Sequence, residues 1–390
     1  MDKTDRLRDY GLAFLLYKQG LSVCGYELIR ELFIFIKLIL NSYLMFLLSY
    51  SSVCSSEEKD IPDPDSGIPR GDEGSDDGDK ETDKVSPFMC TPYNSDKFEK
   101  QILYSCEFDH GFDTEYWENP KDNKFATWTF LPENVETGDG KLELKIKYYK
   151  HTRGTKDLYF TSGMLRSKSK VGYGYYEARI KGADVWPGTC SAFWLYTFPR
   201  EIDNSNGKKN DVVYNEIDVI ELQQVPKSKF ILSQNMHIWV LDEDLKNKQI
   251  KAGQYPKLGK NETTVSWNPE DDYHVYAVEN RPDSVVFYVD NVRVASKPNY
   301  FWHMDMYLTL SLGLRTPFEK YEADGQRLAV NPDGLDKSVL DNEGEFINPE
   351  SPQRFTSVMY VDYIRSWKRD YENFESSKRA FTDEDKQRFK

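Results

Sequence analysis

The chain has 390 residues, with 65 Asp or Glu against 51 Lys or Arg, and its formal net charge is −14. Nucleic acids and anionic membrane surfaces bind clustered positive charge, so this balance argues against both as general partners. A polyanionic substrate remains compatible, because a local group of arginines can act inside an acidic protein. The cysteines show no CxxC or Cys/His spacing, so no zinc or redox motif is indicated. In an exported protein Cys90 and Cys106 could pair, which the sequence leaves open.

Residues 1–54 carry the pattern of an export signal. The apolar run at 38–50 follows Lys37 and ends in the small-residue stretch SSVCSS. This run is too short for a comfortable membrane span. It looks like a bacterial lipoprotein signal, in which Cys54 becomes the lipidated first residue, although an ordinary cleaved signal and a single anchor helix stay open. We therefore expect a cell-surface or outer-membrane lipoprotein, or a secreted protein, whose only membrane contact is a lipid anchor.

Two further segments lie outside the expected fold. Residues 55–87 combine Gly, Pro and acidic residues with almost no apolar side chains. They cannot bury enough surface to offset their ordering entropy, so we expect a disordered acidic linker. Residues 371–390 form a charged tail, for which we expect either a loose chain or a short helix.

The segment between them, residues 88–370, is expected to be one domain. Short alternating runs rich in Tyr, Phe, Val and Ile are interrupted by Gly, Asn, Asp and Pro about every ten residues. No helical period or internal repeat competes, so we predict an all-β, two-sheet sandwich. We also expect the protein to be a monomer. The predicted strands include residues 142–148, a hairpin at 285–296 that turns at Asp290 and Asn291, and residues 308–314 and 358–367.

The segment NEIDVIEL contains three acidic residues on a predicted strand. Glu216 and Asp218 share one face of this strand, and the apolar residues beside them share the other. Glu221 has the opposite parity. A one-residue β-bulge near Val219 or Ile220 would return Glu221 to the carboxylate face, and bulges are common beside active sites.

Two carboxyl groups that face one sugar ring can cleave a glycosidic bond without a cofactor. One attacks the anomeric carbon and the other protonates the leaving oxygen. Asp218 would hold a hydrogen-bonded proton between the two glutamates. The same spacing also arises by chance in a chain with 65 acidic residues. Taken alone, the motif therefore leaves an acidic cation site and a solvated strand face open.

Other blocks of the sequence extend the motif in a recognisable order. They are residues 158–196, 215–224, His237, 300–317 and 359–367. Together they resemble glycoside hydrolase family 16, and within it the kappa-carrageenases, over roughly residues 100–368. The resemblance implies a concanavalin-like β-jelly-roll with a concave groove for a polysaccharide. It also implies retaining endo-hydrolysis of β-1,4 linkages in a sulfated red-algal galactan, with kappa-carrageenan as the expected substrate.

By this resemblance Glu216 is the nucleophile, Glu221 is the general acid/base, and Asp218 is their electrostatic partner. Asp362 resembles the position at which many family members hold a structural Ca²⁺. Calcium needs six to eight oxygen ligands, and the sequence identifies only this one carboxylate. The expectation of a structural Ca²⁺ at Asp362 thus rests on the resemblance, and Ca²⁺ is the one metal that we expect.

Candidate substrate contacts follow from parity and from the resemblance. Trp194 alternates with Phe193 and Leu195, which favours a sugar-stacking platform in the groove over a core position. The resemblance makes His237 a substrate contact and Arg315 a sulfate-binding residue, with a structural histidine and a surface ion pair as the alternatives. Two weaker candidates for sugar contacts, in the core or in the cleft, are Trp128 and Trp302.

Two stretches depart from the kappa-carrageenase pattern. Residues 150–163 are shorter and lack a cysteine, and residues 319–355 replace a cysteine-bearing loop. Since such loops set subsites, furcellaran, porphyran and agarose stay open as substrates. A non-catalytic carbohydrate-binding or adhesion protein is the alternative from another class. Transglycosylation would use the same acidic residues and differ only in what attacks the intermediate.

Overall fold

The computed structural model describes residues 98–120, 126–197, 206–224, 228–322, 326–332, 356–371 and 380–390. The chain divides into two units, residues 1–66 and 67–390, and every described residue belongs to the second. The predicted signal region with Cys54, and the predicted linker, therefore lie outside the described residues. Within the described part, no helix is long and apolar enough to cross a membrane.

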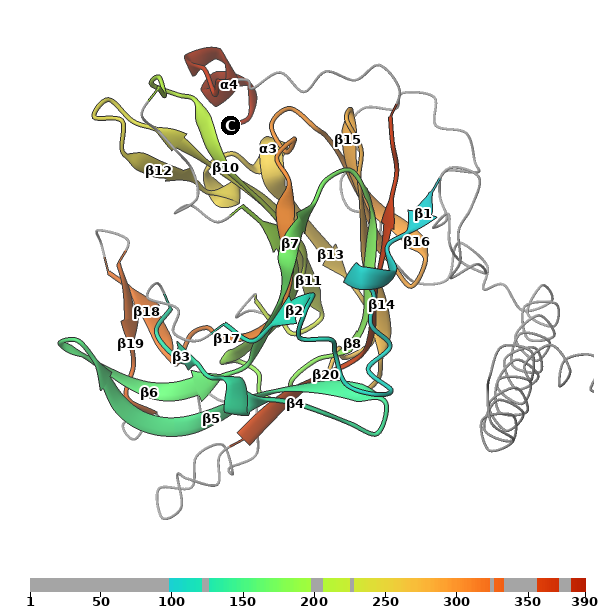
Figure 1. Cartoon of the computed structure of the whole chain (residues 1–390). Helices are drawn as coiled ribbons and strands as arrows, with labels where there is room; N and C mark the ends of the chain where they lie inside the picture. The colour runs from blue at the N-terminus through green and yellow to red at the C-terminus, as the bar shows by residue number, and fades with distance from the viewer. Residues whose placement is uncertain are drawn as a thin grey trace, which may run out of the picture. The chain divides into compact units, whose positions relative to one another are not determined.

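The described residues form a two-sheet β-sandwich, which confirms the predicted fold class (Figure 1). The first sheet has ten strands in the described residues, in the order β16-β15-β14-β8-β20-β5-β6-β3, with β1 beside β20 and β4 beside β5. Its strands are β1 (Glu99–Lys100), β3 (Thr129–Phe130), β4 (Val135–Gly138), β5 (Lys141–Arg153), β6 (Lys156–Ser162), β8 (Gly174–Lys181), β14 (His274–Asn280), β15 (Ser284–Val289), β16 (Val292–Pro298) and β20 (Thr356–Lys368).

The second sheet has eight strands in the described residues, in the order β12-β11-β10-β9-β17-β7-β2, with β13 beside β11. Its strands are β2 (Trp117–Glu118), β7 (Met164–Val171), β9 (Thr189–Tyr196), β10 (Val212–Leu222), β11 (Ile231–Leu241), β12 (Asn247–Ile250), β13 (Lys260–Thr264) and β17 (Met306–Leu314). The remaining elements are the ribbon of β18 (Glu319–Tyr321) and β19 (Arg327–Ala329), helices α3 (Pro256–Gly259) and α4 (Asp383–Arg388), and the 3-10 turns Ile102–Tyr104, Pro132–Asn134 and Ala252–Gln254.

Alternating side chains place the core between the sheets. In β5 the residues Leu142, Leu144 and Ile146 are fully buried, as the alternation predicts. In β17 the even-numbered residues from Met306 to Leu314 are buried in the same way. Strand β17 lies against β5, and β10 lies against β14, so the two apolar faces cover each other.

The predicted hairpin is confirmed as β15 and β16. Its turn residues Asp290 and Asn291 have φ values of 48° and 66°. A two-residue turn with positive φ at both central positions matches the right-handed twist of the strands it joins, and Asp and Asn tolerate this conformation better than other side chains.

The C-terminal segment contains a short helix where it is described. The side chain of Thr382 accepts a hydrogen bond from the backbone N–H of Asp385 and caps helix α4. Phe381 and Phe389, on either side of the helix, are buried in the main core. Of the two alternatives for this segment, the short helix is therefore the one observed at residues 380–390.

A buried carboxyl group lies on the first sheet, in β8. Glu177 is 5% exposed, and the nearest cation is Arg365, whose Nη1 lies 3.8 Å from Glu177 Oε1. Burial raises the pKa of Glu177 to about 7, although the charge of Arg365 opposes the shift. Arg365 also pairs with Glu107 at 2.8 Å, so it keeps a carboxylate partner without Glu177.

We expect Glu177→Gln to stabilise the protein at pH 8 by about 2 kcal/mol. Because its pKa rises from 4.5 when unfolded to about 7 when folded, the stabilising proton is bound below pH 4.5 and is lost as pH rises through 7. The gain over wild type should therefore shrink towards pH 5. Urea unfolding at both pH values measures it, with the exposed Glu133→Gln as control. An equal gain at both pH values would contradict this assignment.

Candidate active site

Strand β10 brings the three acidic residues to one face of the second sheet. Its register with β9 shifts between Asp218 and Ile220, and its register with β11 shifts between Asp218 and Glu221. This is the predicted bulge, since Val219 and Ile220 are both fully buried. Glu221 returns to the carboxylate face, where its exposed fraction is 8%.

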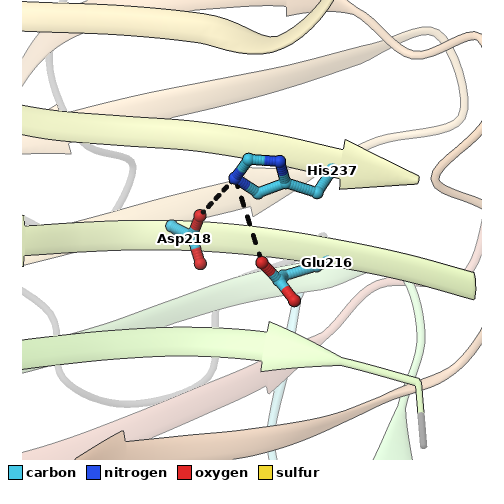
Figure 2. Close-up of side chains that lie close together, drawn as sticks. All are labelled: Glu216, Asp218 and His237. Carbon is cyan, nitrogen blue, oxygen red and sulfur yellow. Dashed lines mark ion pairs between the residues drawn. The ribbon is translucent and has the colours of Figure 1, made fainter. Parts of the chain in front are cut away.

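His237 on β11 faces two of these carboxyl groups across the strand pair (Figure 2). Its Nε2 is 3.3 Å from Asp218 Oδ2 and 3.9 Å from Glu216 Oε1. The backbone N–H of Ala252 donates to His237 Nδ1 at 3.2 Å, so Nε2 carries the ring proton towards Asp218. The structure thus brings together four residues that the sequence singled out: Glu216, Asp218, Glu221 and His237.

The pKa values of this cluster are coupled through one network. Burial and the charges of Glu221 and Glu216 raise the pKa of Asp218 to about 8, so Asp218 keeps a proton at neutral pH. Burial alone would lower the pKa of His237, whereas its hydrogen bond to Asp218 and the nearby carboxylates raise it to about 9. A doubly protonated ring would need a proton on Nδ1, where the Ala252 N–H already donates, and protonated Asp218 no longer adds its charge to raise the pKa of His237. We therefore assign the neutral form of His237, with its proton on Nε2.

Glu216 has a second partner that the sequence analysis missed. The hydroxyl group of Tyr214 donates a short hydrogen bond to Glu216 Oε2. Tyr214 packs against Trp239 on β11, with ring centroids 4.8 Å apart. The sequence contained a signal for this contact, because residues 214, 216 and 218 alternate along the strand and so share one of its faces.

Glu221 is held by residues from three different segments. Arg315 Nη2 donates to Glu221 Oε1 at 2.5 Å, and Asn235 Nδ2 donates to Oε2 at 3.3 Å. The thiol of Cys190 lies 4.0 Å from Oε1. Arg315 also donates from Nε to the side chain of Gln224 and from Nη1 to its neighbour's carbonyl, Leu314 O. The structure therefore gives Arg315 a direct contact with the predicted acid/base.

Trp194 lies on the carboxylate face, as parity predicts. It pairs with Asp218 on β10 and with Thr309 on β17, and its indole N–H donates to Ser311 Oγ at 3.0 Å. Its ring stacks on Tyr196 with centroids 4.4 Å apart, and Trp194 stays only partly buried. An aromatic surface thus adjoins the carboxyl groups.

Of the two places that the sequence left open for Trp302, the core and the cleft, the structure shows the core. Trp302 is fully buried, and its indole N–H donates to the backbone carbonyls of Glu216, at 2.9 Å, and His237, at 3.1 Å. It supports the two strands from the core side. Trp128 is 5% exposed and packs edge-on against Phe130, so its ring offers almost no surface to a sugar, and the core alternative holds for it too.

The described residues around Asp362 do not fit Ca²⁺. Asp362 Oδ2 accepts a hydrogen bond from Arg179 Nη1 at 2.7 Å, so a guanidinium already compensates this carboxylate. Among the described residues, Glu216, Asp218 and His237 form the one group of three or more His, Cys, Asp or Glu side chains close enough to share a metal ion. Hydrogen bonding through the His237 proton accounts for that cluster.

The unpaired thiol of Cys106 donates to Gly111 O at 3.2 Å, and Cys90 lies outside the described residues.

We expect Trp302→Phe to lower the free energy of unfolding by about 2 kcal/mol more than Trp128→Phe does. Both changes replace a buried indole by a smaller phenyl ring. Only Trp302→Phe also removes a hydrogen-bond donor from two backbone carbonyls. The Trp128 indole N–H has no hydrogen-bond partner among the described residues. Urea unfolding of both variants measures the difference. Equal losses would show that the Trp302 hydrogen bonds contribute nothing beyond packing.

Comparison with known proteins agrees with this geometry. The model of the family described as "Beta-porphyranase A-D, GH16 domain" matches residues 98–369. The kappa-carrageenase of Pseudoalteromonas carrageenovora is 34% identical over 266 residues, which cover 65% of this chain and 61% of that protein. A beta-glucanase of Acetivibrio thermocellus is 30% identical over 188 residues, 47% of this chain and 46% of the relative. The chain thus spans less than two thirds of the length of either relative.

Solved structures extend the comparison. The kappa-carrageenase of P. carrageenovora in complex with a kappa-carrageenan oligotetrasaccharide has a TM-score of 0.61 and 31% identity, over 72% of this chain and 99% of that one. The kappa-carrageenase of Zobellia galactanivorans gives 0.61 and 32%, with the same coverage. With the matching family model, these similarities show that the chain belongs to glycoside hydrolase family 16.

Proposed function

We propose that this protein is a retaining endo-glycosidase that hydrolyses β-1,4 linkages in a sulfated galactan, with kappa-carrageenan as its substrate. The observation that carries the proposal is the bulge in β10, which brings Glu221 to the same face as Glu216 and Asp218, beside the aromatic ring of Trp194. The similarity to two kappa-carrageenases supports the choice of substrate.

In the first step Glu216 attacks the anomeric carbon and Glu221 protonates the leaving oxygen. Protonated Asp218 lies between the two glutamates in sequence and limits the negative charge that the site must hold. His237 orients Asp218 through its Nε2 proton. In the second step Glu221 takes a proton from the attacking water, and the glycosyl–Glu216 ester is cleaved. A sugar hydroxyl in place of this water would give transglycosylation.

Digestion of a polysaccharide panel tests the proposal. The panel contains kappa-carrageenan, furcellaran, porphyran, agarose and laminarin, and the products are sized by chromatography. We expect kappa-carrageenan to be cleaved into oligosaccharides that retain the β-anomer in early proton NMR spectra. Porphyran is the second candidate substrate, which the matching porphyranase-type family model supports, and preferred cleavage of porphyran would favour it over kappa-carrageenan. No cleavage of any galactan would overturn the proposal.

Outside the described residues, we also propose that Cys54 carries the lipid anchor of an exported, monomeric enzyme. The small residues before Cys54 and the polar stretch after it support this. Labelling cells with an alkyne fatty acid should mark the wild-type protein and not Cys54→Ala.

We expect Glu216→Gln to abolish turnover while the fold is retained, because an amide cannot form the glycosyl ester at a useful rate. The loss should exceed about a thousandfold in kcat. Product release from kappa-carrageenan measures it, and thermal melting checks the fold. Activity near the wild-type level would show that another residue is the nucleophile.

Arg315→Ala should impair cleavage of kappa-carrageenan more than cleavage of its desulfated chain. Arg315 pairs with Glu221, so both substrates should be cleaved more slowly. A sulfate ester bound by the remaining guanidinium N–H groups would add a loss of about 1.5–3 kcal/mol on the sulfated chain alone. The ratio of kcat/KM values on the two chains measures this.

Arg179→Ala is the matched control, because it removes a guanidinium that pairs with Asp362 in the first sheet. Equal losses of kcat/KM on the sulfated and desulfated chains would show that Arg315 supports Glu221 and does not bind a sulfate ester.

A further inference from the structure

Tyr214 is placed by the backbone of β10 as firmly as the carboxyl groups are. The register with β11 shifts between Val212 and Tyr214, and shifts again between Asp218 and Glu221. Residues 214–218 are therefore a short regular stretch between two irregularities, in which Tyr214, Glu216 and Asp218 point the same way. Tyr214 is 4% exposed, so its ring does not offer a surface to a sugar.

The hydrogen bond from Tyr214 distinguishes the two oxygens of Glu216. Oε2 accepts the phenolic proton. Oε1 has no donor within hydrogen-bonding distance among the described residues, and His237 Nε2 lies 3.9 Å away from it. Burial and the charge of Glu216 raise the pKa of Tyr214 well above its ordinary value, so the phenol remains a donor at every working pH.

We infer that Tyr214 is a positioning residue for the nucleophile: it holds Oε2, so that Oε1 bonds to the anomeric carbon, and it assists release of the sugar from Glu216. This inference rests on the proposed function, because it needs a covalent glycosyl–Glu216 intermediate.

The charge on Glu216 changes in opposite directions in the two steps. In the first step the Oε1–carbon bond forms, the glycosidic carbon–oxygen bond breaks, and the leaving oxygen takes the electron pair and the proton of Glu221. Oε2 becomes a neutral ester carbonyl oxygen, so the hydrogen bond from Tyr214 weakens. In the second step water bonds to the anomeric carbon and gives a proton to Glu221, while the Oε1–carbon bond breaks and its electron pair returns to Glu216.

A hydrogen bond to a carboxylate is stronger than one to a neutral acceptor. The bond from Tyr214 therefore gains strength as the second step proceeds. Tyr214→Phe removes this gain but keeps the ring that packs against Trp239. We expect the second step to slow about tenfold. The first step should change little, because the loss of positioning, which slows it, is offset by the removal of a hydrogen bond that this step weakens.

Steady-state kinetics on an activated substrate tests the inference. The probe is a kappa-carrageenan tetrasaccharide with a 2,4-dinitrophenyl β-glycoside at its reducing end, for which the second step limits kcat. In Tyr214→Phe, kcat and KM should fall together about tenfold, with kcat/KM within about threefold of wild type. Mass spectrometry of acid-quenched reactions should show a larger fraction of protein with a glycosyl group on the peptide that contains Glu216.

Tyr276→Phe is the matched control. Tyr276 is fully buried in β14 of the other sheet, and its hydroxyl group has no hydrogen-bond partner among the described residues. This variant loses the same atom and should keep wild-type kinetics.

A fall in kcat/KM equal to the fall in kcat, at constant KM, would show a structural role and overturn the inference. So would kinetics identical to wild type. Both outcomes leave the proposed function intact, because wild type still turns over. A wild type that neither cleaves a galactan nor releases dinitrophenol would overturn the proposed function and, with it, the inference.

Discussion

The site depends on one irregularity in β10. In a regular strand Glu221 would point into the core between the sheets, where an ionised carboxylate costs several kcal/mol unless it is paired. The bulge places Val219 and Ile220 in the core in succession and turns Glu221 back towards Glu216 and Asp218. Core burial and active-site geometry are therefore satisfied by the same extra residue.

Three carboxyl groups on one strand face repel each other, and the surrounding donors offset this repulsion. Glu216 accepts from Tyr214, and Glu221 accepts from Arg315 and from Asn235 on β11. Protonation removes the charge of Asp218, since its pKa is raised to about 8 by burial and its two acidic neighbours. Each of the three carboxyl groups thus has its own hydrogen-bond donor or its own proton. The described residues therefore compensate the three acidic groups on this face by themselves.

Features that depend on the alternation of side chains along a strand could be predicted from the sequence. Features outside such alternation could not. The strands, the turn at Asp290, and the bulge follow from alternation and turn chemistry, and the structure confirms them. Trp302 lies in the connection between β16 and β17, where no alternation tells core from surface. The contact between Arg315 and Glu221 joins residues 94 positions apart, which a local pattern cannot reveal. The alternation of side chains could have placed Tyr214 on the same strand face as Glu216, but a tyrosine on a strand is more often a packing residue.

Trp302 shows that the core and the site are not separate parts of this fold. Its single N–H contacts the carbonyls of Glu216 and His237, which are paired across β10 and β11, while its ring is fully buried. A change in packing beneath these strands would shift both backbones, and with them the 3.3 Å contact between His237 and Asp218. Catalytic groups tolerate little misplacement, since an error of about 1 Å can cost a hundredfold in rate. Substitutions in this part of the core should therefore be read as substitutions in the active site, although none of them touches a sugar.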